Sequence, residues 1–86
     1  MNTFKLVISS PDGNLFEGDA ARLILRGADG DLAIMAGHIP FMTTVKEGKC
    51  KILLENGEEK TGYILSGLLT VSKDCVTLLS GTFKFD

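Results

Sequence analysis

The stretch KCKILLENGEEKTGYIL, residues 49–65, decides the fold that we expect for this chain. Two segments in which apolar and polar residues alternate, 49–55 and 58–65, lie directly on either side of Asn56 and Gly57. Asn-Gly between alternating segments is the strongest short-range signal of a β-hairpin, because a type I′ turn requires positive φ at both central residues. The stretch therefore predicts two antiparallel strands joined by a two-residue turn.

The turn also predicts a register. If two residues form it, Cys50 lies opposite Tyr63 and Ile52 lies opposite Thr61. Because successive side chains of a strand point to opposite faces, the register decides which residues of the hairpin enter the core.

The same period of two continues along the chain, with turn residues every 8–12 positions, which is typical of an antiparallel sandwich or barrel. We predict an all-β fold, an antiparallel β-sandwich of about nine to ten short strands in a single domain spanning residues 1–86. Besides the hairpin, the expected strands are FKLVIS (4–9), LFEGDA (15–20), RLILR (22–26), LAIM (32–35), FMTTVK (41–46), LLTVS (68–72), CVTLLS (75–80) and TFKF (82–85).

Composition limits the classes of function. The chain has 86 residues, of which 44% are apolar, with five phenylalanines and no tryptophan, so we expect one small aliphatic core. Nine basic and eleven acidic residues give a net charge of −2. Nucleic-acid binding needs a clustered positive face, and the densest basic region, Lys46, Lys49 and Lys51, contains Glu47. No nucleic-acid partner is expected.

Neither a secretion signal nor a transmembrane helix is predicted. The N-terminus lacks a basic start followed by an apolar run. The uncharged runs 32–45 and 61–72 are shorter than the ~18 apolar residues that a membrane span needs. Cys50 and Cys75 lack the close spacing of a zinc pair or a redox dithiol, so we interpret both as reduced, small apolar residues.

The stretch GDLAIMAGHIPFM, residues 30–42, holds the only histidine, His38. A single histidine does not make a zinc site, no serine lies in a Gly-x-Ser-x-Gly elbow, and GADGD (27–31) lacks the lysine of a phosphate loop. Asp29 and Asp31 are candidates for a general acid–base pair, but two carboxylates in a solvated turn are the far more common explanation of this pattern. We predict no catalytic, cofactor-binding or metal-binding residue, no cofactor and no small-molecule ligand. His38 remains either a turn residue or a contact on a partner surface.

A second interpretation is a lipoyl or biotinyl carrier, which is a β-sandwich of similar length. Those domains present a modifiable lysine at a hairpin tip, and the candidate here is Lys46, between Val45 and Glu47. The sequence context differs from that of the carriers, and the Asn-Gly turn offers no lysine at its tip.

Several motifs in order along the chain carry a resemblance. They are Pro11-Asp12-Gly13, Phe16-Glu17-Gly18, Asp29-Gly30-Asp31, Gly37-His38-Ile39-Pro40, Ser66-Gly67 and Val76-Thr77-Leu78-Leu79. Together they resemble the N-terminal β-sandwich domain of the epsilon subunit of F-type ATP synthases. Ala36, Ala33 and Leu68 depart from that pattern, where a proline and two glycines are usual. Family members continue into a C-terminal helical hairpin, and this chain ends at Asp86, so we expect neither that inhibitory hairpin nor its ATP binding here.

The resemblance implies a non-catalytic rotor subunit at the foot of the central stalk, peripheral to the cytoplasmic face of the cell membrane and without membrane insertion. Such a subunit links the gamma subunit to the ring of c subunits and couples ion translocation to ATP synthesis or hydrolysis. Carried over by position, the expected c-ring contacts are Arg26, Gly27, Ala28, Asp29, Gly30 and Asp31. The expected gamma contacts are Gly37, His38, Ile39, Pro40, Phe41, Met42, Thr43 and Ser66.

Overall fold

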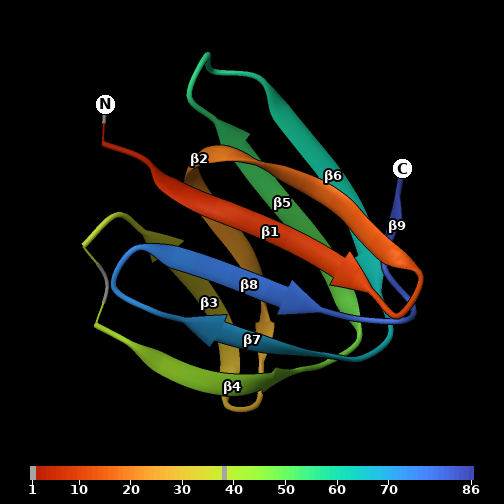
Figure 1. Cartoon of the computed structure of the whole chain (residues 1–86). Coiled ribbons are helices and arrows are strands. Elements are labelled where there is room, and N and C mark those ends of the chain that lie inside the picture. The colour runs from red at the N-terminus through yellow and green to blue at the C-terminus, as the bar shows by residue number, and fades with distance from the viewer. Residues whose placement is uncertain (1, 38) are drawn as a thin grey trace.

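A computed structural model describes residues 2–37 and 39–86. Within those residues the chain forms nine β-strands and no helix, so the predicted all-β class is confirmed (Figure 1). No helix long and apolar enough to cross a bilayer is found in the described part of the chain. The strands are β1 (Phe4–Ser10), β2 (Gly13–Gly27), β3 (Gly30–Met35), β4 (Phe41–Val45), β5 (Gly48–Leu54), β6 (Glu59–Ile64), β7 (Gly67–Val71), β8 (Cys75–Leu79) and β9 (Lys84–Phe85).

The strands form two layers that share β2. The first sheet has the order β4-β7-β8-β1 and ends on the N-terminal half of β2. The second sheet joins β3, the C-terminal half of β2, β5, β6 and β9. In Figure 1, β1, β8, β7 and β4 cross the front of the molecule and β3 lies behind them. All pairs are antiparallel as expected except β1 with β8, which is parallel; a parallel pair needs a long connection, and here most of the chain separates the two strands.

β2 corrects the expectation of two short strands, because LFEGDA and RLILR belong to one strand of 15 residues. The half-buried or buried positions are even-numbered up to Ala20, whereas from Ala21 to Gly27 the buried positions are odd-numbered and only Ile24 among the even ones is half-buried. Pairing with β5 skips Ala21, since Ala20 lies opposite Leu54 and Arg22 lies opposite Leu53. This bulge turns the strand, so that one half faces the core from the first sheet and the other half from the second.

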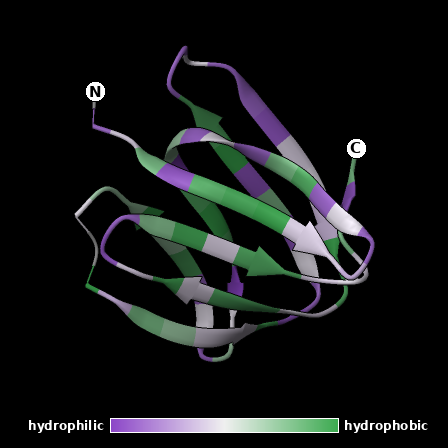
Figure 2. Ribbon diagram, viewed as in Figure 1, coloured by the Kyte–Doolittle hydropathy of each residue, from purple (hydrophilic) through white to green (hydrophobic). Residues whose placement is uncertain are grey.

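The core lies between the two sheets and is aliphatic, as the composition predicts. Figure 2 shows hydrophobic and hydrophilic residues following one another along the strands. Fully burying a leucine or isoleucine side chain stabilises the fold by roughly 1.5–3 kcal/mol, so these residues dominate the stability. The buried cluster is Leu6, Ile8, Ala20, Leu23, Leu25, Ile34, Val45, Cys50, Ile52, Ile64, Leu69, Val71, Val76, Leu78 and Phe83.

The hairpin between β5 and β6 forms, but the predicted register is wrong by one residue. Cys50 lies opposite Gly62 and Ile52 opposite Lys60. Only glycines have positive φ among the described residues, so Asn56 does not adopt the type I′ conformation.

A three-residue loop replaces the expected two-residue turn. Leu54 N donates to Glu58 O (2.8 Å), and Gly57, at φ 89°, donates to Leu54 O (3.0 Å). With this loop the even-numbered residues of both strands share the inner face, so Ile52 and Ile64 are both buried. The expected register would have set buried residues of one strand against exposed residues of the other.

Gly62 meets an aromatic cluster at the edge of the second sheet. The rings of Phe83 and Phe85 pack edge to face, with centroids 4.9 Å apart. A Cβ at Gly62 would lie 2.6 Å from Phe83 Cζ and 2.8 Å from the backbone oxygen of Lys84. Only a glycine leaves room for β9 and Phe83 to close this end of the core.

We expect Gly62→Ala to lower the free energy of unfolding by about 1–3 kcal/mol, because the backbone of Lys84 must move to admit the methyl group. Urea unfolding measures the change. Gly81→Ala is the control, since its Cβ would meet only Pro11 Cδ at 3.8 Å; this variant should match the wild type or gain slightly. Equal stability of both variants would contradict the close packing at Gly62.

Both cysteines are free: Cys50 is fully buried in the core, as expected of a small apolar residue, whereas Cys75 is half-buried with its Sγ 3.8 Å from Thr77 Oγ1. Burial raises the pKa of the Cys50 thiol from 9.0 to about 12, because the apolar core disfavours the thiolate.

The raised pKa of Cys50 predicts a pH dependence of stability. The folded state holds the thiol proton more tightly than the unfolded state, so the stabilisation is fully present below pH 9 and is lost as the pH rises toward about 12. We expect the free energy of unfolding to fall up to ~1.4 kcal/mol per pH unit more steeply in the wild type than in Cys50→Ala. Val76→Ala, which removes core volume without removing a thiol, should keep the wild-type slope. Parallel slopes for Cys50→Ala and the wild type would rule the effect out.

Two candidate docking surfaces

The first candidate surface is the polar turn, which we define as residues 26–31 between β2 and β3. Gly27 pairs with Gly30 and Arg26 pairs with Asp31. Ala28 and Asp29 therefore form the tip of the turn, where both are exposed. A Cβ on the buried Gly27 would lie 2.6 Å from Leu32 Cδ1. The turn therefore brings together all six residues that the sequence assigns to the c-ring, with Gly27 contributing backbone geometry and the others an exposed rim.

The charges of the polar turn are solvated. Arg26 Nε lies 3.5 Å from Asp31 Oδ1, and both side chains are more than half exposed. An exposed pair of this kind contributes at most ~1 kcal/mol to folding. Asp29 forms no ion pair with any described residue and lies at the exposed tip. This arrangement fits the solvated turn better than a general acid–base pair.

Lys46 lies beside the polar turn, although the sequence did not predict it as part of that surface. Val45 pairs with Gly27, and Lys46 N donates to Arg26 O (2.8 Å). Lys46 and the turn line one broad, open hollow. The sequence does not show this proximity, because it depends on the pairing of β2 with β4, which are not consecutive in the chain. The same geometry disfavours the carrier interpretation, because β4 and β5 pair with other strands and Lys46 is not at a hairpin tip.

The second candidate surface is the β3–β4 segment, residues 35–43, at the other end of β3. Three of its apolar side chains are largely exposed: Met35 (52%), Ile39 (78%) and Met42 (64%). Gly37 has φ 83°, a conformation that favours glycine, and the following Pro40 is exposed. His38 lies outside the described residues, so its two interpretations stay predictions.

Within β4 the expected gamma contacts alternate between the two faces of the strand. Met42 points outward, while Phe41 and Thr43 are half-buried and Phe41 packs against the core. Met35 was not among the predicted contacts, although its place at the end of an alternating strand is visible in the sequence.

The exposed side of Met42 continues onto the outer face of the first sheet. The pairings of β4, β7, β8 and β1 align Met42, Thr70, Thr77 and Val7 in one row, and Thr44, Leu68, Leu79 and Ser9 in the next. We call these eight residues the neutral face, because none of them carries a charge. An uncharged face of apolar and threonine side chains is typical of a surface that another protein covers.

Ser66 lies apart from the other predicted gamma contacts. Gly67 pairs with Val45, whereas Phe41 pairs with Val71 at the opposite end of the β4–β7 ladder. Ser66 therefore lies near the polar turn. Its carbonyl accepts hydrogen bonds from the buried Ser80 Oγ (2.7 Å) and from Thr82 Oγ1 (3.2 Å), so its backbone is held firmly.

The described residues contain no group of three or more His, Cys, Asp or Glu side chains placed to hold a metal ion. Both surfaces are suited to contact with other proteins: the polar turn is charged and solvated, and the β3–β4 segment with the neutral face is apolar and uncharged.

Comparisons with known proteins identify relatives of this fold. Residues 3–85 match the family model described as ATP synthase, Delta/Epsilon chain, beta-sandwich domain. The chain is 39% identical over 82 residues to an ATP synthase epsilon chain of Chromohalobacter salexigens, which covers 95% of this chain and 58% of that relative. This chain therefore spans little more than half the length of that relative.

Two solved structures share the fold. One is the cryo-EM structure of the Euglena gracilis mitochondrial ATP synthase, OSCP/F1/c-ring, with a TM-score of 0.89, 18% identity and coverage of 96% of this chain and 53% of that one. The other is the central stalk/c-ring of the Tetrahymena thermophila mitochondrial ATP synthase, with a TM-score of 0.78, 14% identity and coverage of 96% and 66%.

Proposed function

The chain belongs to the family of the ATP synthase Delta/Epsilon chain beta-sandwich domain, and from that premise we propose that it is a non-catalytic central-stalk subunit of an F-type ATP synthase. In this role it links the gamma subunit to the c-ring and couples ion translocation to ATP synthesis or hydrolysis. It is peripheral to the membrane, on its cytoplasmic face.

The observation that carries the proposal is the exposed apolar set Met35, Ile39 and Met42, of which Met42 is part of the neutral face and Met35 lies at the end of β3 on the second sheet. The sandwich already has its own buried core, so these side chains do not serve its packing. Their burial against a partner contributes about 25 cal/mol for each Å² of apolar surface removed from water. We assign this surface to the gamma subunit, with Gly37, His38, Ile39, Pro40, Phe41, Met42 and Thr43 as contacts and Ser66 at the far edge.

The polar turn is assigned to the c-ring loops. Asp31 is 75% exposed at its side chain and is only loosely held by Arg26, so its carboxylate is available to a basic group on the ring. Rim ion pairs guide docking more than they hold it. The remaining contacts, Gly27, Ala28, Asp29 and Gly30, present a tight, stiff turn.

The fold suits a part that transmits torque. The two sheets are joined covalently by the continuous strand β2, and its pairing with β1, β3 and β5 ties both surfaces to one rigid core. A load applied at the polar turn therefore reaches the β3–β4 segment through backbone hydrogen bonds.

We expect Met42→Asp to weaken co-elution of this chain with its cognate gamma subunit in size-exclusion chromatography by at least about tenfold in apparent affinity, because a carboxylate would be buried without a partner. Asn56→Asp is the matched control. It adds the same charge to the exposed β5–β6 loop, keeps the side-chain oxygen that accepts a hydrogen bond from Glu58 N, and should co-elute like the wild type. Equal co-elution of both variants would move the gamma surface elsewhere.

We expect Asp31→Lys to weaken association with the isolated c-ring in pull-down assays. Its free energy of unfolding, measured by circular dichroism, should stay within ~1 kcal/mol of the wild type. Glu58→Lys makes the same charge change in the exposed β5–β6 loop, at the opposite end of the molecule from the polar turn (Figure 1). It should bind the ring normally. Undiminished binding of Asp31→Lys would refute the assignment of the polar turn.

A further inference from the structure

The outer side of the second sheet has the opposite character to the neutral face. The register of its strands places the outward residues of β2, β5 and β6 next to one another. Five of the outward side chains on this sheet are basic: Arg22, Arg26, Lys49, Lys51 and Lys84.

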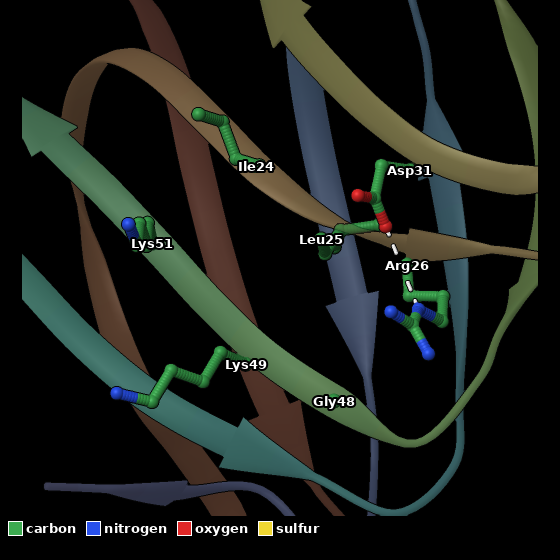
Figure 3. Close-up of a pocket in the computed structure, with 7 residues that line it drawn as sticks. All are labelled: Ile24, Leu25, Arg26, Asp31, Gly48, Lys49 and Lys51. Atoms are coloured by element: carbon green, nitrogen blue, oxygen red, sulfur yellow. Dashed lines mark hydrogen bonds and ion pairs between the residues drawn. The ribbon is translucent and has the colours of Figure 1, made fainter.

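A partly open hollow of about 250 Å³ lies on this basic side. Its lining residues are Ile24, Leu25, Arg26, Asp31, Gly48, Lys49 and Lys51. Figure 3 shows Arg26 on β2 at one side of the hollow and Lys49 and Lys51 on β5 at the other, with the Lys49 side chain extended away from Arg26. Gly48 has no side chain, so the backbone is open at that point.

Two of the three cations at the hollow, Lys49 and Lys51, form no ion pair with any described residue. Asp31 lies within ion-pair distance of Arg26 alone. Glu47, which interrupts this basic region in the sequence, accepts a hydrogen bond from Tyr63 Oη (2.6 Å), and Tyr63 lies opposite Lys49 in the β5–β6 ladder, so this carboxylate borders the hollow without forming an ion pair with either lysine. That hydrogen bond raises the pKa of Tyr63, since it favours the phenol over the phenolate.

We propose that this hollow, between Arg26 on β2 and Lys49 and Lys51 on β5, is a binding site for a phosphate group. The guanidinium offers a planar fork of donors, and each lysine carries a point charge on a flexible four-carbon stem that can turn toward a bound phosphate. Arg26 Nε lies 3.5 Å from Asp31 Oδ1, and the other donors of the guanidinium are free of hydrogen bonds to the described residues. Ile24 gives the hollow an apolar wall.

The phosphate has two sources with the same chemistry, a soluble phosphate compound or the headgroup of an acidic phospholipid. The site stands on the isolated chain and does not depend on the proposed stalk function. It goes beyond the composition-based expectation that no small-molecule ligand binds, because that expectation counted Glu47 against the lysines and could not place Arg26 beside them.

The test is a titration of the uniformly ¹⁵N-labelled 86-residue chain with pyrophosphate at low salt, followed by NMR. We expect saturable amide shifts concentrated at Arg26, Gly48, Lys49 and Lys51. Lys49→Gln combined with Lys51→Gln should raise the apparent Kd at least about tenfold, because two charge-assisted contacts are lost. Both substitutions are on exposed strand positions, so the melting temperature should be unchanged.

The matched control removes two lysines elsewhere, Lys5→Gln with Lys73→Gln, and should keep the wild-type Kd. Shifts spread over the whole surface, or an equal loss of affinity in both double variants, would show only general attraction to a charged ligand and would overturn the site. Co-sedimentation with vesicles distinguishes the two sources: Lys49- and Lys51-dependent binding to phosphatidylglycerol vesicles, absent with phosphatidylcholine, identifies a lipid headgroup. Pyrophosphate binding without vesicle binding identifies a soluble phosphate compound.

Discussion

The whole structure depends on the bulge where Ala20 and Ala21 are both buried in β2. An extended strand alternates its side chains, so two consecutive buried residues require the backbone to turn at that point. The side chains of Ala20 and Ala21 are single methyl groups, so they leave room for the backbone to bend between the two sheets. Because one strand supplies both layers, the sheets do not slide past each other, and the turn that follows β2 has a fixed place relative to β1 and β8.

This bend also separates the chemistry of the two outer sides. In a two-layer sandwich, half of each strand's side chains are committed to the core and the other half are free to serve another purpose. In the first sheet, strands β4, β7 and β8 use that freedom for uncharged residues such as Met42, Thr70 and Leu79, which lose little when they are desolvated. The second sheet uses it for cations, which are costly to bury without a counterion. The two sides are thus suited to partners of different character.

The β5–β6 hairpin shows where local signals are sufficient and where they end. Asn56 and Gly57 predicted the hairpin correctly, because positive φ at Gly57 is a local property. They did not predict its register, since a three-residue loop and a two-residue turn use the same residues, and the choice falls to the burial of Ile52 and Ile64 on the same face of the hairpin. The candidate surfaces show the same limit: the polar turn is a local feature and was found whole, whereas Ser66 was grouped with residues from which the β4–β7 ladder separates it.

The sequence by itself determined the all-β class, nearly all of the strands, the aliphatic core and the turn at residues 27–31, because period-two alternation, glycine conformation and turn chemistry act over a few neighbouring residues. Only the tertiary structure decided that LFEGDA and RLILR are one bent strand, that β1 runs parallel to β8, and that Arg26 meets Lys46 on one side and lies across a hollow from Lys49 and Lys51 on the other. Those outcomes depend on which strands become neighbours. That choice minimises the exposed apolar surface of the whole chain, and no short window of residues contains it.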